Sequence, residues 1–168
     1  MRRFSLFLAL APLLALSFSL RAETTHSIGL GAHYWRVIDD IDVDNVEESG
    51  LAYLGAYRID GGLIAFQGEL EVFPEDFGGA TERVYSPQAL VLVGGGIYAG
   101  LGVGVLYSDG EFADKPYYLV RAGIELAAFG PVSLDINANY LFNDFDSFDT
   151  SDIDTDTVTL GAMVRVEL

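Results

Sequence analysis

Stretches in which apolar residues occupy every second position recur along this chain, and they constrain its fold more than any other feature. In residues 97–108 one face of the pattern is apolar and the other has glycine at three of its six positions, with no charged residue on either. A period of two is typical of a β-strand. Because an uncharged glycine face is a poor surface for water, it suits the crowded interior of a narrow barrel whose apolar face meets lipid. We therefore predict strands that cross a membrane.

The first 22 residues have the composition of a secretory signal peptide. Arg2 and Arg3 form a basic start, residues 4–20 are an uncharged apolar run, and Ala22 is a small residue suited to the position before a cleavage site. The run contains Pro12 and is short for a transmembrane helix, which favours the signal peptide. We expect cleavage after residue 22, so that residues 1–22 are removed and residues 23–168 form one domain.

Composition excludes several classes of protein. The chain has no Cys, which excludes a disulfide scaffold, a thiol enzyme and a lipoprotein anchor. Its formal net charge of −16 argues against nucleic-acid binding, because phosphate backbones repel such a protein. Beyond the leader, no uninterrupted apolar run is long enough for a spanning helix. A membrane location therefore requires strands.

The alternating pattern predicts eight strands, at residues 27–37, 51–59, 63–73, 87–93, 97–108, 117–128, 132–142 and 158–168. Three connections are short and rich in glycine, which accepts the positive φ of tight turns, and the other four are longer. Short turns at one end and long loops at the other are typical of outer-membrane barrels. The predicted fold class is all-β: an eight-stranded antiparallel up-and-down transmembrane β-barrel in the bacterial outer membrane.

The same alternation assigns the charged strand residues to the lumen. A lipid-facing Arg or Lys near the bilayer midplane costs about 2–4 kcal/mol, so this sorting favours the barrel. Because buried charges must be paired, we expect Arg165 to pair with Asp135 or Glu125, and Arg121 with Glu69 or Glu71. A gated ion path through these pairs is the alternative. The predicted lumen network comprises Arg58, Glu69, Glu71, Arg121, Glu125, Asp135, Arg165 and Glu167.

Two further features concern the outer wall. The strand at residues 87–93 is apolar on both faces from Ala89 to Val93, so its facing cannot be read from the sequence. Aromatic residues on the lipid-facing side gather near the long-loop ends of their strands, which is typical of a girdle at the membrane interface. The predicted girdle comprises Tyr34, Tyr53, Tyr107, Tyr118 and Phe142.

Residues 100–104 form a glycine-rich strand segment, and residues 160–168 place apolar residues at alternate positions up to the C-terminal carboxylate. In these features the chain resembles the small eight-stranded outer-membrane barrels, such as the OmpA membrane domain and OmpX. The resemblance implies outer-membrane lipid as the surroundings and the barrel-assembly machinery as a partner during biogenesis. Leu168 stands where Phe or Trp is usual. We expect a monomer.

The long connections hold eighteen of the 25 acidic residues. Asp40, Asp42 and Asp44 continue the outward alternation of the first strand, and Asp152, Asp154 and Asp156 continue that of the last. These strands adjoin when a barrel closes, so the two rows offer oxygen ligands suited to Ca²⁺ or Mg²⁺. We favour solvated surface loops, with weak divalent-cation binding as the more specific hypothesis. No other cofactor is expected.

Catalysis has little support in the sequence. His26 and His33 are its two histidines, and neither lies in the His-x-Ser arrangement of lipid A deacylases. The leading hypothesis is a non-enzymatic outer-membrane barrel that serves envelope integrity or surface interaction through its acidic extracellular loops. A small pore or transport barrel is the main alternative, and a lipid-modifying enzyme is a weaker one. A soluble eight-stranded barrel of the lipocalin type is the alternative fold.

Overall fold

The structure is a computed structural model that describes residues 24–37, 49–75, 77, 82–142 and 157–168. The expected signal peptide therefore lies outside the described residues. Within them, no helix is long and apolar enough to cross a membrane. The strands are β1 (Thr25–Val37), β2 (Ser49–Asp60), β3 (Ile64–Phe73), β4 (Val84–Gly94), β5 (Ile97–Gly104), β6 (Tyr107–Ser108), β7 (Glu111–Phe112), β8 (Tyr117–Phe129), β9 (Val132–Phe142) and β10 (Thr157–Glu167).

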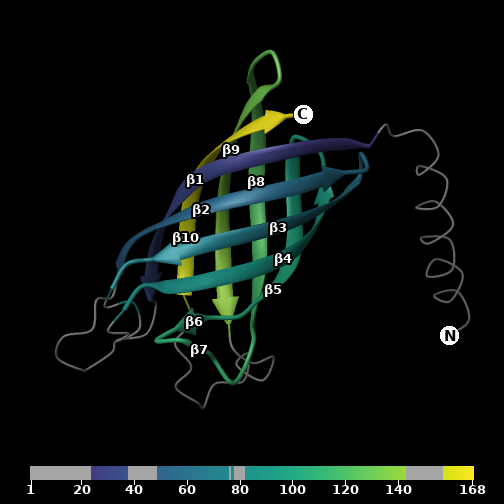
Figure 1. The fold of residues 1–168 in the computed structure, drawn as a ribbon. Coiled ribbons are helices and arrows are strands. Elements are labelled where there is room, and N and C mark those ends of the chain that lie inside the picture. The colour runs from purple at the N-terminus through teal and green to yellow at the C-terminus, as the bar shows by residue number, and fades with distance from the viewer. Residues whose placement is uncertain (1–23, 38–48, 76, 78–81, 143–156) are drawn as a thin grey trace, which may run out of the picture.

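The eight long strands form one closed antiparallel barrel (Figure 1). Around the barrel the order is β3, β2, β1, β10, β9, β8, β5 and β4, and pairing of β3 with β4 closes it. The first and last strands pair along most of their length, from Ser27 opposite Glu167 to Val37 opposite Thr157. Closure leaves no long edge strand unpaired, which a bilayer requires because it offers no water to free backbone groups. The predicted fold class is confirmed.

The two ends of the barrel differ. Three tight turns and the C-terminus lie at one end, called here the turn end. The strand ends that the long connections join lie at the other, called the loop end (Figure 1). Gly94 has φ 132° in the turn between β4 and β5, and a Cβ there would meet the Ile97 carbonyl and the Tyr98 backbone. This turn therefore requires glycine.

The structure divides the predicted strand at residues 97–108. β5 ends at Gly104, and Tyr107 pairs instead with Tyr85 of β4 and with Phe112 of β7. Beyond Gly104, Leu106 still packs against apolar residues inside the barrel. The inward facing of Leu106 therefore agrees with the alternation, although the pairing of β5 has ended.

β4 begins at Val84, before the predicted start at Pro87. Pro87 pairs with Leu70 of β3 on one side, and its carbonyl accepts a hydrogen bond from Val105 N on the other. A strand residue directs its N and its carbonyl to the same side, so the missing N–H of Pro87 faces the position where the β5 ladder has ended. The bond that proline cannot donate, to the Val105 carbonyl, thus falls at the point where the β5 ladder ends.

The outer wall is apolar and the inner face is polar. Leu30 and Ile97 are 75% and 79% exposed, whereas inward neighbours such as Gly29 and Tyr98 are buried. In β4 the even-numbered residues from Val84 to Leu92 are buried, which settles the facing of this strand. An apolar wall of this kind is stable against lipid and not against water, which excludes the lipocalin alternative.

Aromatic residues gather on the outward face near the loop end. Tyr34 and Tyr53 are exposed, and Tyr85 of β4 joins them. Phe142 is only 4% exposed, although it shares the outward parity of Ile136 and Tyr140 on β9 and stands opposite Tyr118. Its ring centroid lies 5.9 Å from that of Tyr118 and 6.1 Å from that of Tyr140, and such neighbours account for its burial.

Candidate functional site

The centre of the lumen holds an ion pair that spans the barrel. Arg121 of β8 donates from Nη1 to Glu69 Oε2 at 2.6 Å and from Nη2 to Glu69 Oε1 at 3.0 Å. Its Nε donates to Asn139 Oδ1 at 2.5 Å. Both charged side chains are buried. All three guanidinium nitrogens of Arg121 thus have acceptors, which is the condition under which a buried ion pair is tolerated.

A second ion pair lies closer to the turn end. Arg165 Nη2 donates to Asp135 Oδ2 at 3.0 Å and to Gln67 Oε1 at 2.9 Å. Asp135 also accepts from Tyr98 Oη at 2.6 Å. Gln67 in turn donates to Glu69 Oε2 at 2.7 Å, so one amide links the two ion pairs. The polar groups therefore form a connected network rather than isolated pairs.

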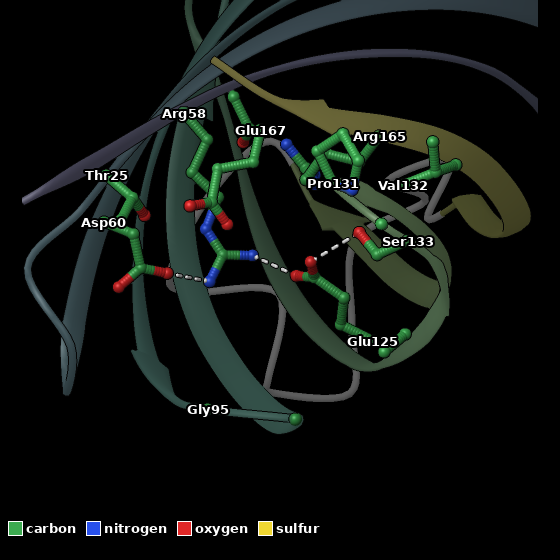
Figure 2. A pocket seen from close by; sticks show the side chains of 14 residues that line it. Thr25, Arg58, Asp60, Gly95, Glu125, Pro131, Val132, Ser133, Arg165 and Glu167 are labelled. Carbon is green, nitrogen blue, oxygen red and sulfur yellow. Dashed lines mark hydrogen bonds and ion pairs between the residues drawn. The ribbon is translucent and has the colours of Figure 1, made fainter.

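Arg58 organises the turn end of the lumen. Its Nη2 lies 2.6 Å from Asp60 Oδ2 and its Nη1 lies 3.0 Å from Glu125 Oε2 (Figure 2). Ser133 Oγ donates to Glu125 Oε1 at 2.7 Å. These residues line a pocket of about 330 Å³ that Arg165 and Glu167 also border. The lumen is thus hollowed at its turn end.

The polar network continues toward the loop end through Glu71. This carboxylate lies 2.8 Å from His33 Nδ1 and accepts a hydrogen bond from Gln88 Nε2 at 2.8 Å. The imidazole fits because Gly161 stands opposite His33 on β10, where a Cβ would collide with Cδ2 and Nε2 of the ring. Among the described residues, no hydroxyl hydrogen-bonds to His33 Nε2. A nucleophile paired with this base is therefore not found there.

Apolar side chains close the lumen at the loop end. Phe77, from the connection between β3 and β4, stacks on Phe73 with ring centroids 4.0 Å apart and meets Trp35 edge-on at 4.8 Å. Trp35 and Phe73 are almost completely buried. We call this cluster the plug. It comprises Trp35, Ala52, Phe73, Phe77, Val84 and Leu106.

The predicted lumen residues occupy the inner side of the barrel, but their pairing differs in part from expectation. Arg165 contacts Asp135 and Arg121 contacts Glu69, both among the expected partners. Glu125 pairs with Arg58 across the lumen and not with Arg165. Glu167 is exposed at the turn end. Alternation tells which face a residue occupies but not which side chain meets it across the barrel.

The six aspartates predicted as ligands of a divalent cation, at positions 40, 42, 44, 152, 154 and 156, lie outside the described residues. Within the described ranges, no group of three or more potential metal ligands is found.

Sequence reasoning missed the plug. Three of its residues are inward-facing and apolar and lie close to the loop end of their strands: Trp35, Phe73 and Val84. For β1 and β3, this common position near the loop end could have been predicted from the sequence. Phe77 belongs to a connection, where alternation carries no information.

The sequence matches no protein-family model. No curated protein gives a significant match to it. Among solved structures, neisserial surface protein A (NspA) is similar with a TM-score of 0.58 and 14% identity, over 87% of this chain and 99% of NspA. The N-terminal β-barrel domain of Pseudomonas aeruginosa OprF is similar with a TM-score of 0.52 and 11% identity, over 87% of this chain and 100% of that domain. The Yersinia pestis outer membrane protein Ail gives a TM-score of 0.44 at 18% identity, over 85% and 99% of the two chains.

The likenesses to NspA and to the OprF domain show the fold. Together with the closed antiparallel barrel, the apolar outer wall and the aromatic residues at the loop end, they define the chain as a small eight-stranded β-barrel of the outer-membrane type. In that orientation the turn end is periplasmic and the loop end faces outward.

Proposed function

We propose that this protein is a non-conducting, non-enzymatic outer-membrane barrel that serves envelope integrity or surface interaction through its acidic loops. The observation that supports this proposal is the filled lumen. The plug of Trp35, Phe73 and Phe77 occupies the outer end, and ion pairs occupy the middle. A barrel of eight strands has an interior just wide enough for its own side chains.

The main alternative, a small pore, requires a solute to displace these side chains. Arg121 and Glu69 reach each other across the lumen at 2.6 Å, and both are buried. Separating them in a low-dielectric interior leaves two uncompensated charges, at a cost of several kcal/mol. The hollow at the periplasmic end, beside Arg58 and Glu125, ends below this pair. The arrangement therefore favours a barrel that is open only at its periplasmic end over a continuous channel.

Swelling of proteoliposomes in a small neutral sugar tests the proposal. We expect the refolded protein to give no more swelling than protein-free liposomes, because the lumen admits no solute. Swelling that grows with protein content would favour the pore. Mass analysis of lipid A from a deletion strain addresses the enzymatic alternative, and an altered acylation or phosphorylation pattern would support it.

The acidic loops carry the more specific part of the proposal, which stands on the sequence. Asp40, Asp42 and Asp44, together with Asp152, Asp154 and Asp156, are proposed to bind Ca²⁺ or Mg²⁺ with weak affinity, about 10⁻⁴ to 10⁻³ M. Calorimetry of the refolded barrel, beside a variant with Asn at the six positions, tests this. Equal heats for the two proteins would leave the loops as solvated chain.

A monomeric state and recognition by the barrel-assembly machinery through residues 160–168 are also proposed, on the basis of the sequence.

A further inference from the structure

Among the described residues, the outward face of the eight long strands carries one charged side chain, that of Arg36. The other charged side chains of these strands point into the lumen or lie at its periplasmic mouth. Arg36 shares its face with Tyr34 and Leu30, both exposed, and it is exposed itself. Within the described ranges, Arg36 is therefore an isolated cation on an apolar wall.

The height of Arg36 limits what this partner can be. The residue stands next to the last position of β1, at the end that faces outward. An Arg on the lipid face costs about 2–4 kcal/mol at the midplane and about 0–1 kcal/mol near the interface. At this height the guanidinium lies among the headgroups of the outer leaflet, where anionic lipids offer a counter-ion.

The barrel itself supplies no counter-ion among the described residues. The cross-strand neighbours of Arg36 are Ser49 on β2 and Val158 on β10, both uncharged. A sheet commonly balances an exposed cation with a carboxylate directly opposite, and this sheet does not. Every ion pair described for the chain lies in the lumen or at the periplasmic mouth. Within this part of the chain, the planar N–H fork of Arg36 has no carboxylate partner on the sheet.

From the rim of the barrel toward its middle, the side chains around Arg36 become less polar, as a membrane lipid does from headgroup to acyl chain. Tyr34, Arg36, Val158 and Leu160 line a hollow of about 450 Å³ on the outer wall. Tyr34 stands opposite Leu160, one step deeper than the pair of Arg36 and Val158. From the rim inward, the surface thus offers a cation, an amphipathic ring and then aliphatic side chains. A chain of net charge −16 has no general attraction for anionic lipid, so the contact depends on local cations such as Arg36.

We propose that Arg36 binds the phosphate group of a phosphorylated lipid of the outer leaflet, whose acyl chain lies along Tyr34, Leu160 and Leu30. The guanidinium forms paired hydrogen bonds with two phosphate oxygens, a geometry that Lys cannot reproduce. The Ser49 hydroxyl, beside Arg36 on β2, is placed to donate a further hydrogen bond. This proposal rests on the orientation of the barrel in the outer membrane and not on the closure of its lumen.

Native mass spectrometry of the refolded protein with defined lipids tests the proposal. The probes are lipid A carrying its phosphates and the same glycolipid after removal of the phosphates. We expect wild type to prefer the phosphorylated form, and Arg36→Gln to lower the affinity for that form about tenfold, the loss of a charge-assisted contact. Arg36→Lys should retain part of the preference. Lys115→Gln removes a charge from the connection before β8, outside the hollow, and should leave binding unchanged.

Four results would overturn the proposal. They are equal binding of the two lipids by wild type, unchanged binding by Arg36→Gln, an equal loss in Lys115→Gln, and full displacement of the lipid by millimolar inorganic phosphate, which would indicate a site for free anions. Heat-modifiable gel mobility shows beforehand that each variant is folded. Because proteoliposome swelling does not depend on Arg36, failure here leaves the proposal of a closed lumen standing, and swelling by wild type leaves the lipid site standing.

Discussion

Arg121 and Glu69 meet across the lumen through two hydrogen bonds, of 2.6 and 3.0 Å, although they belong to strands on different sides of the barrel. Their strands, β8 and β3, are separated by β4 and β5 on the shorter path around the sheet. Backbone pairing holds each strand to its neighbours, whereas this pair ties distant strands together. It therefore fills the middle of the barrel and fixes its cross-section.

Removing one member of this pair should destabilise the barrel strongly. We expect Glu69→Leu or Arg121→Met alone to lower the free energy of unfolding by about 3–5 kcal/mol, because either leaves an unpaired buried charge. The double variant Glu69→Leu with Arg121→Met should lose less than the sum of its single changes. Urea unfolding in detergent measures these energies, and additive losses would show that the two charges are not coupled.

Arg165 offers a second test of the lumen. Arg165→Met leaves Asp135 with Tyr98 and Asn137 as its hydrogen-bond donors, but without a cation. We expect a lower melting temperature and no gain in conductance, since the plug and the Arg121–Glu69 pair remain. Discrete channel steps in this variant would mean that Arg165 itself blocks a path.

Two strand glycines form a matched pair. A Cβ at Gly161 would collide with the ring of His33, whereas a Cβ at Gly68 meets nothing within 4 Å. Gly161→Ala should therefore cost about 1–3 kcal/mol through overpacking, and Gly68→Ala should be neutral or stabilise by about 0.5 kcal/mol. Equal effects on urea unfolding would contradict the assignment of Gly161 to the crowded interior.

The plug can be followed by fluorescence, because Trp35 is the one tryptophan of the chain. Its emission should resist quenching by acrylamide in wild type. Phe77→Ala removes the ring that meets Trp35 edge-on, so quenching should rise severalfold. Phe112→Ala, in the exposed strand β7, is the control and should change nothing. A strongly quenched wild type would show that the plug is open in solution.

The sequence predicted the architecture because a period of two reports facing directly. Wherever one face carried charge or glycine, as in β3 and β8, the inward residues were assigned as the structure places them. Facing failed for β4, where Ala89–Val93 is apolar on both sides, and only pairing with β3 settles it: Glu71 stands opposite Ser86 and Glu69 opposite Gln88.

Contacts across the lumen were harder to predict than facing. The partner of Glu125 depends on the stagger and tilt of all eight strands, which alternation does not contain. The break after Gly104 is also absent from the alternation, which continues to Ser108 although the pairing of β5 ends at Gly104. Local patterns therefore described the wall of the barrel well and its filling only in part.

Single-channel recording in a planar bilayer tests the central claim, a closed lumen, most directly. Insertion of the refolded wild-type protein should give no discrete conductance steps across the physiological range of voltage and salt, because Trp35, Phe73 and the Arg121–Glu69 pair occupy the path. Gel mobility of the same preparation shows that the barrel is folded. Reproducible steps of uniform size from that folded protein would contradict the account and identify the barrel as a pore.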